Sequence, residues 1–526
     1  MKLSSFSLVF RRVFAPKRSF MLRKTLGLAL AFSLTALAIF CVLFLFSRPD
    51  LDFAELKSPY TLHILRFTLY QALLSTLLSI LPAFFLARAL FYSDFAFKAA
   101  FLRLLYLSMA MPGVVLALSL ISSYGKNSIF YKLSQGLGLD YSLYGLGGIL
   151  LAHVFYNLAL CSRIFLSSLE CISSNERQIA SQLGLSGFFR LQILERFYLQ
   201  KAALSAFSLV FMLCLSSFSV VLLLGKGPAT STLEVAIYQA LSYDYDPGKA
   251  AGLSLLQLTL CSAALLVVGA LNFNFSPASS RALGYYPKLS KTQKCANALV
   301  ILLGACFLLY PLINLALSAV FAPWLKALPN LIKPAATSLG VALGSSLLCI
   351  SFALLLLFAS LKLKPRQSTL VQASGMIILA IPSIVLSSFF FLLFAQLKSP
   401  YLAPSLVIFT NALIALPFAL RLLKDPLSYF CARYEQLLVL LNKDKALFIL
   451  KGIKPALLQT AGICAILSLG DFGIIAIFGS SEFSTLPMHL YKQLGAYRAS
   501  EAVCTAALML ILSYLILKAF TRRAHD

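Results

Sequence analysis

The sequence predicts an all-α, polytopic membrane protein, and three observations lead to this prediction. Hydrophobic residues make up 60% of the chain and charged residues only 12%, whereas a soluble domain carries about 25% charged residues. The apolar residues are grouped into runs of the length that an α-helix needs to cross a bilayer, about 20 residues. Short basic segments separate these runs.

The chain contains twelve such runs, and we expect each of them to cross the lipid bilayer. The first run follows a basic segment and has no small-residue cleavage site after it, so we expect a retained anchor and not a signal peptide. In order, the expected spans are 25–46, 64–87, 100–122, 145–168, 202–224, 249–271, 296–318, 336–361, 370–394, 403–420, 456–478 and 501–520.

The charge of the chain supports this topology. The formal net charge is +26, from 44 Lys and Arg against 18 Asp and Glu. Such a balance can indicate nucleic-acid binding, but here the basic residues lie in short loops between apolar runs. If the N-terminus is inside, most of the Lys and Arg fall in inside loops, which is the positive-inside pattern. We therefore expect both termini in the cytoplasm and no nucleic-acid partner.

Pairs of similar segments indicate an internal repeat. The segments that resemble one another are Met111–Leu116 with Ile381–Leu386, Ser217–Gly225 with Asp471–Gly479, and Thr232–Leu241 with Thr485–Leu494. Because each half holds six expected spans, the two halves have the same orientation and form parallel repeats. The expected division is a first six-span repeat at 1–275, a cytoplasmic linker at 276–294 and a second six-span repeat at 295–526.

Two expected inside loops are longer than the others, and they occupy equivalent places in the two repeats. They lie at 169–201, after the fourth span, and at 421–455, after the tenth. Matched long loops on one side suggest a two-fold partner in the cytoplasm.

The first long loop contains a short amphipathic stretch, Ser174–Gly187. Ile179, Leu183 and Leu185 stand among polar residues, and Gly184 can supply the left-handed conformation that ends a helix. Such a helix can fill a groove of another protein or lie on the lipid surface, and the spacing leaves both readings open. In the second loop Asn442 takes the place of the glycine.

The segment Glu176–Gly184 resembles the EAA loop of binding-protein-dependent ABC importer permeases. Two such loops in one chain resemble the fused permeases of the iron(III) and thiamine import class. The resemblance covers nearly the whole chain and is sharpest to permeases for thiamine and thiamine pyrophosphate at Leu86–Leu90, Gly148–Phe155, Ala236–Pro247 and Ser468–Gly473. The chain departs from the family at Gln178 and Ile179, where Glu-Ala is usual, and its second loop lacks the glycine.

This resemblance implies a type I ABC importer (MetI-like) permease fold in a bacterial inner membrane. It also implies two copies of an ABC ATPase subunit on the cytoplasmic side and a periplasmic thiamine-binding protein outside. The residues expected to couple to the ATPase are Glu176, Gln178, Ala180, Leu183 and Gly184 in the first loop, and Tyr434, Glu435, Leu438 and Asn442 in the second.

A few polar residues within the spans are candidates for a substrate path. Asp471 is a charge in the eleventh expected span, and buried charges in lipid are costly and often functional. It can face the thiazolium cation of thiamine, or it can bond to backbone groups near Gly470 and Gly473. Ser217 is its repeat partner. Asn157 and Asn411 can contact substrate or make interhelical hydrogen bonds.

The outside loops carry aromatic and acidic residues that can form a gate or contact the binding protein. These are Tyr243, Asp244, Tyr245, Asp246 and Tyr491. Tyrosines are also common at the membrane interface without such a role.

The sequence gives no sign of chemistry within the chain itself. No phosphate-binding GxxxxGK[ST] pattern occurs, and neither CxxC nor a Cys/His cluster is present. We therefore expect no catalytic residue, cofactor or metal, and ATP hydrolysis by a partner. The alternatives are an iron(III) ABC importer permease of the same layout, an ion-coupled twelve-helix secondary carrier, and a membrane assembly protein without transport.

Overall fold

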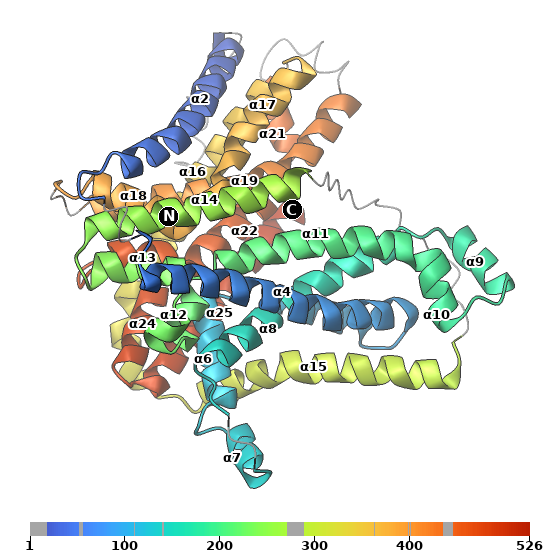
Figure 1. The fold of residues 1–526 in the computed structure, drawn as a ribbon. Coiled ribbons are helices and arrows are strands. Elements are labelled where there is room, and N and C mark those ends of the chain that lie inside the picture. The colour runs from blue at the N-terminus through green and yellow to red at the C-terminus, as the bar shows by residue number, and fades with distance from the viewer. Residues whose placement is uncertain are drawn as a thin grey trace. The chain divides into compact units, whose positions relative to one another are not determined.

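The computed structural model describes residues 18–51, 56–109, 111–138, 141–270, 289–361, 363–397, 399, 401–434 and 445–525. All the regular elements in these ranges are helices (Figure 1). Nine of the described helices are long and apolar enough to cross a membrane, and eleven spans result if each of two sharply bent pairs is one span. The prediction of an all-α, multi-pass membrane protein is confirmed at this level. The eleventh expected span, 456–478, coincides with a shorter apolar helix of 17 residues followed by a second short helix.

The chain divides into two compact units. Unit 2 comprises residues 53–236 and 259–322. Its elements are α4 (Pro59–Tyr92), α5 (Lys98–Met109), α6 (Gly113–Tyr124), α7 (Ile129–Gly136), α8 (Leu146–Glu170), α9 (Ser174–Gln182), α10 (Gly187–Arg190), the π-helix η1 (Leu191–Glu195), α11 (Arg196–Leu215), α12 (Ser219–Leu224), the 3₁₀-helix η2 (Gly227–Thr230) and α15 (Lys291–Val320). Its core forms where α4 packs along α8, and α11 packs against both.

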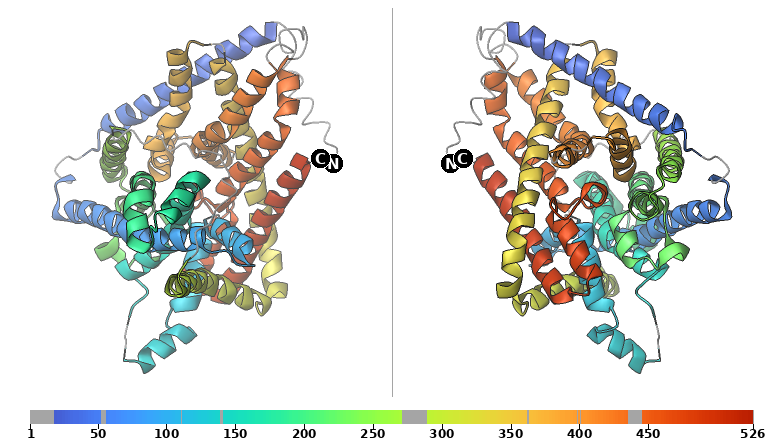
Figure 2. Two further views of the ribbon diagram at one scale, coloured as in Figure 1. Left: turned by 90° about the vertical axis from the view of Figure 1, so that its right-hand side faces the viewer. Right: turned by 90° about the vertical axis from the view of Figure 1, so that its left-hand side faces the viewer.

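Unit 1 comprises residues 1–52, 237–258 and 323–526. Its elements are α2 (Arg18–Phe46), α16 (Trp324–Ser360), α17 (Pro365–Met376), the 3₁₀-helix η3 (Ile377–Ala380), α18 (Ser383–Leu393), α19 (Leu402–Arg433), α21 (Lys445–Gly452), α22 (Lys454–Gly470), α23 (Gly473–Phe478), α24 (Leu486–Gly495) and α25 (Ala499–His525). Within it α16 packs along α19 and α22, and α22 packs along α25 (Figure 2). Two helices, α13 (Leu233–Ser242) and α14 (Pro247–Ala270), contain the points where the chain passes between units.

The first helix of each half belongs to the unit formed mainly by the other half. The N-terminal helix α2 packs along α16 and α17 of unit 1, and α15, which begins the second half, packs against α4 and α6 of unit 2. The compact units therefore differ in membership from the two repeats expected from the sequence.

Two prolines divide apolar runs that the sequence predicts as single spans, 100–122 and 370–394. Pro112 precedes α6 and Pro382 precedes α18, each in an extended conformation at the helix start. The axes of α5 and α6 differ by 110°, and those of the α17–η3 segment and α18 by 88°. Proline has no N–H to donate to the preceding turn and disfavours a helical residue before it, so both effects end the first helix.

Matching local geometry recurs in the two halves. The N–H of Leu233 donates to Thr68 Oγ1 at 3.0 Å, and the N–H of Leu486 donates to Ser338 Oγ at 2.7 Å. Each bond satisfies a backbone group at the start of a short helix, α13 or α24. The left-handed residues Tyr245 (φ 53°) and Tyr497 (φ 58°) then lie just after these helices. These features support the internal repeat.

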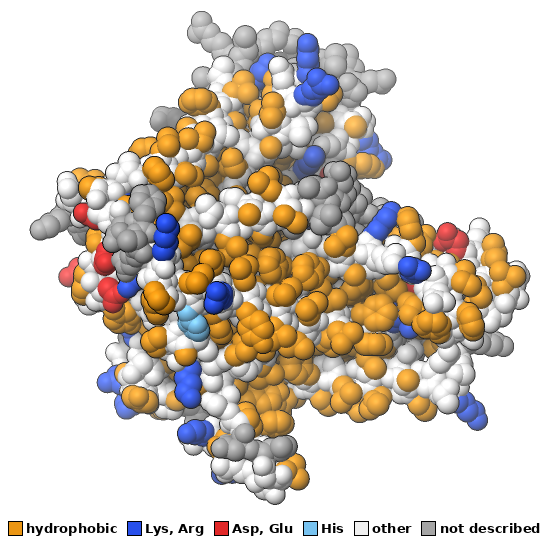
Figure 3. All heavy atoms as spheres, in the orientation of Figure 1, with side chains coloured by type: hydrophobic (Ala, Val, Ile, Leu, Met, Phe, Trp, Pro, Cys, Tyr) orange, Lys and Arg blue, Asp and Glu red, His pale blue; other side chains and the backbone are white. Residues whose placement is uncertain are grey.

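The long helices of unit 2 present apolar side chains at the surface. In Figure 3 hydrophobic side chains gather over α4, α11 and α15. Exposed members on α4 include Tyr70, Leu77, Leu81 and Phe85. Such a surface is unusual in water but is expected where lipid covers the helices.

Candidate functional site

The helix α9 of the first long loop begins with a capping box. Glu176 N–H donates to Ser173 Oγ at 3.2 Å, and Ser173 N–H donates to the Glu176 carboxylate at 2.9 Å. These bonds satisfy two donors that the first helical turn leaves free. The hydroxyl of Tyr198, on α11, donates to the same carboxylate at 3.4 Å. Glu176 therefore holds α9 in shape, a role that the Ser-x-x-Glu spacing at 173–176 would have indicated.

Gly184 ends α9 in the left-handed conformation that the sequence predicts for it. Its φ is 68°, its N–H donates to Ser181 O at 3.1 Å, and Leu185 N–H donates to Ala180 O at 2.9 Å. A Cβ at this glycine would meet no atom within 4 Å. The need for glycine is therefore conformational and not steric.

The two faces of α9 differ sharply. Ala180 and Arg177 are buried, with 4% and 3% of their surfaces exposed, whereas Ile179 is 54% and Leu183 71% exposed. The Arg177 guanidinium lies 5.6 Å from the ring centre of Phe91, on α4. Gln178 is also exposed. Among the predicted coupling residues, Ala180 thus faces the rest of the chain, and Gln178 and Leu183 face away from it.

The second long loop is described only at its two ends. Tyr434 follows α19, and its ring centre lies 4.7 Å from that of Phe430 and 6.0 Å from that of Phe448. Glu435, Leu438 and Asn442 lie outside the described residues.

Asp471 caps a helix. It stands between α22 and α23, and its Oδ2 accepts the Ile474 N–H at 3.0 Å. The backbone alternative expected from the sequence is therefore present in the structure. The bond leaves open a contact with substrate, because a carboxylate has several acceptor positions.

Ser217 and Asn157 make interhelical contacts. The Ser217 hydroxyl lies 2.8 Å from His153 Nε2, and the Ser75 hydroxyl lies 2.8 Å from His153 Nδ1. This buried chain joins α4, α8 and the break between α11 and α12. The Asn157 side-chain amide donates to Cys214 Sγ at 3.4 Å. Asn411 is buried on α19, with 6% of its surface exposed.

The outer segments bring two predicted residues together in an aromatic cluster. The hydroxyls of Tyr243 and Tyr491 lie 3.5 Å apart. The Tyr238 ring packs edge-on against Tyr243 with centres 5.8 Å apart, and the Phe472 ring lies 5.1 Å from that of Tyr491. Phe472, next to Asp471, is a member that the prediction did not include.

The neighbouring acidic residues serve local structure. Asp244 forms an ion pair with Lys249 Nζ at 3.2 Å, and Asp246 Oδ1 accepts the Lys249 N–H at 2.9 Å at the start of α14. Tyr245, between them, is 80% exposed. Of the predicted outer residues, Tyr245 is thus the most available for contact with another molecule.

Several known proteins are similar in sequence to this chain. No family model matches the sequence. The thiamine transport system permease protein of Escherichia coli (strain K12) is 39% identical over 495 residues, which cover 91% of this chain and 92% of the relative. The protein of the same name from Haemophilus influenzae is 37% identical over 485 residues, covering 89% of each. The chain belongs to the thiamine transport system permease family.

A more distant relative is named for the transport of a different solute. A probable sulfate transport system permease protein from Helicosporidium is 29% identical over 213 residues, covering 40% of this chain and 76% of the relative. The thiamine permeases match over about nine-tenths of the chain, so the similarity to them includes both halves.

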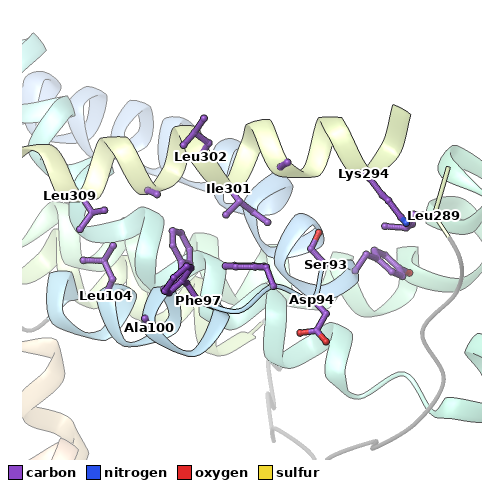
Figure 4. A pocket seen from close by; sticks show the side chains of 15 residues that line it. Ser93, Asp94, Phe97, Ala100, Leu104, Leu289, Lys294, Ile301, Leu302 and Leu309 are labelled. Atoms are coloured by element: carbon purple, nitrogen blue, oxygen red, sulfur yellow. The ribbon is translucent and has the colours of Figure 1, made fainter. Parts of the chain in front are cut away.

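One cavity in unit 2 is lined by none of the predicted site residues. It has a volume of about 720 Å³ and is lined by α5, α15 and the segment between α4 and α5. Ser93, Asp94 and Lys294 supply its polar groups, and Figure 4 shows them at one end, with Leu104, Ile301 and Leu309 among its apolar lining.

Proposed function

We propose that the chain is the membrane-spanning permease of an ABC importer that carries thiamine and its phosphates across the bacterial inner membrane. The observation that carries this proposal is the 39% identity to a thiamine transport permease over 91% of the chain. The exposed apolar face of α9, held in shape by its capping box and Gly184, supports the assignment at the level of geometry.

The proposed machine has partners on both sides of the membrane. Two copies of an ATPase subunit dock on the cytoplasmic loops 169–201 and 421–455, and a thiamine-binding protein delivers cargo outside. The chain contributes two parallel six-helix repeats of MetI-like type, at 1–275 and 295–526, with both termini in the cytoplasm. It makes and breaks no covalent bond, because the ATPase hydrolyses the ATP.

For the substrate path we propose the outer aromatic cluster and the carboxylate beside it. Ring faces and a carboxylate attract an organic cation such as a thiazolium. Tyr243, Tyr491 and Phe472 lie together next to Asp471, which supports a gate there. Ser217, Asn157 and Asn411 remain candidates deeper along the path. Tyr245, Asp244 and Asp246 are proposed as the contact with the binding protein.

Stimulated ATP turnover tests the cargo. The complex of permease, ATPase and binding protein is placed in proteoliposomes, and ATP hydrolysis is measured with thiamine, thiamine pyrophosphate or ferric iron. The proposal expects stimulation by the thiamine compounds alone. Stimulation by ferric iron and not by thiamine would favour the iron permease instead.

A further inference from the structure

A fully buried carboxylate lies within the first long loop, 169–201. Glu195, the last residue of η1, has no exposed side-chain surface. Arg88 of α4 donates to it through both Nε, at 2.6 Å, and Nη2, at 3.2 Å. The hydroxyl of Tyr92, one turn further along α4, donates to Glu195 Oε1 at 2.7 Å. A buried carboxylate is costly unless it is paired and hydrogen-bonded, and this one has three donors.

The π-helix explains how Glu195 reaches this place. In the turn Leu191–Glu195 the backbone bonds skip one residue more than in an α-helix. One residue is thereby inserted between α10 and α11, and such insertions are frequent at functional sites. Glu195 is buried while the next two residues, Arg196 and Phe197, are exposed.

A second arginine connects the ion pair to the end of α9. Arg190, 6% exposed, donates from Nε and Nη2 to Leu185 O, at 3.2 and 2.9 Å. Its guanidinium lies 5.2 Å from the ring centre of Tyr92. Leu185 directly follows Gly184 and bonds back to Ala180. A continuous set of contacts therefore runs from the C-terminal end of α9 through Arg190 and Tyr92 to Glu195.

The equivalent place in the second half is apolar. Thr68 and Ser338 make matching hydrogen bonds on α4 and α16, and this register places Phe358 where α4 has Arg88. Phe358 is 3% exposed. An ion pair at this position is thus present at the first long loop and is not matched by Phe358 in the second half.

We propose that Arg88 and Glu195 are positioning residues that join the docking helix α9 rigidly to α4 and α11. A displacement of α9 by the ATPase is then passed to both long helices. Without the pair α9 still forms, because its own caps remain. Its displacement is then taken up by bending of the loop and does not reach α4 and α11. This inference rests on the proposed function, since it assumes an ATPase that moves α9.

The first test compares docking with transport in the reconstituted complex. Glu195→Gln removes the charge and keeps the shape, and Tyr92→Phe removes one hydrogen bond without leaving a buried charge unpaired. We expect both variants to bind the ATPase as the parent does and to hydrolyse ATP. The thiamine imported per ATP falls about tenfold in Glu195→Gln, a typical size for coupling between sites, and by a smaller factor in Tyr92→Phe. Phe358→Leu, at the equivalent place, is the matched control and keeps the parent ratio.

Exchange of the two charges separates the pair from the individual residues. In Arg88→Glu with Glu195→Arg we expect the transport ratio to recover toward the parent value, because the pair is restored with reversed polarity. A parent-like ratio in both Glu195→Gln and Tyr92→Phe would overturn the inference, as would loss of ATPase binding in Tyr92→Phe.

Distance measurements report directly whether the ion pair holds α9 and α11 together. Spin labels at the exposed residues Gln182 on α9 and Gln200 on α11 report how rigidly the two helices move together. We expect a narrow distance distribution in the parent, with and without ATP, and a broad one in Glu195→Gln. An equally narrow distribution in the variant would contradict the inference. If the parent itself imports no thiamine with ATP, the proposed function fails, and this result is distinct from failure of the inference.

Discussion

At the scale of single residues, three carboxylates of this protein hold helix starts in place. Glu176 caps α9, Asp246 caps α14 and Asp471 caps α23. Each stands where a helix begins and leaves N–H groups without a partner. A charged residue that resembles a contact site in the sequence can therefore have a local structural role, and variants must separate the two.

Two substitutions test whether Glu176 acts through the capping box. Glutamine can take part in a capping box but alanine cannot. We expect Glu176→Gln to bind the ATPase much as the parent does. Glu176→Ala should weaken binding by a factor of about five, corresponding to a capping loss of about 1 kcal/mol. The affinity of the ATPase for the purified permease measures both. If Gln and Ala reduce binding equally, the charge itself contacts the ATPase and the capping explanation is wrong.

Asp471 can be tested in a similar way. The amide oxygen of Asn can accept the same backbone N–H, so Asp471→Asn keeps the cap. If the carboxylate attracts the cation, thiamine uptake falls several-fold while assembly is unchanged. Asp50→Asn, which makes the same change at a carboxylate that pairs with Arg48, is the matched control and leaves uptake unaltered. Unchanged uptake in Asp471→Asn would make the residue structural only.

At the scale of elements, the sequence predicted what depends on hydrophobic run length and local turn chemistry. The long apolar helices and the left-handed Gly184 follow directly from such patterns. It did not predict the sharp breaks at Pro112 and Pro382, because a proline in an apolar run can kink a helix or end it. The burial of Glu195 could not be predicted from the sequence either, because a π-helix shifts which residues share a face.

The docking helix has a face that can be tested separately from its fold. The apolar side chains of Ile179 and Leu183 are 54% and 71% exposed, so Ile179→Ser with Leu183→Ser should leave membrane insertion intact. We expect ATPase binding to fall by at least about tenfold, because two apolar anchors are lost from the interface. Ile129→Ser on α7, where the side chain is 75% exposed, is the control. Normal ATPase binding in the double variant would place the docking surface elsewhere.

A large side chain at Ala180, on the same helix, should have a different effect. Its side chain is buried against the permease, so a large residue there pushes α9 away from its support. We expect Ala180→Leu to reduce both ATPase binding and the thermal stability of the detergent-purified permease. The Ile179 and Leu183 double variant reduces ATPase binding alone. Unchanged stability in Ala180→Leu would mean that the site accommodates the larger side chain.

At the scale of the whole molecule, the sequence predicted an internal repeat, but it did not predict that α2 packs within unit 1 and α15 within unit 2. Recurrent Pro, Phe, Gly and Tyr residues indicated equivalent positions in the two halves. The matching hydrogen bonds at Thr68 and Ser338 support this equivalence. The helix α2 is apolar on all sides, so nothing in its pattern specifies which partner it packs against. Packing in lipid depends on close surface fit, which a hydrophobic pattern does not encode.

The central claim is that ATP hydrolysis by a partner docked on this chain drives thiamine import. Proteoliposomes containing the permease with its ATPase, supplied with binding protein and radiolabelled thiamine on the outer side, test it most directly. We predict uptake that requires ATP at the ATPase side and that is lost in the Ile179→Ser, Leu183→Ser variant. Uptake that continues without ATP, or without the ATPase, would contradict the account and favour an ion-coupled carrier.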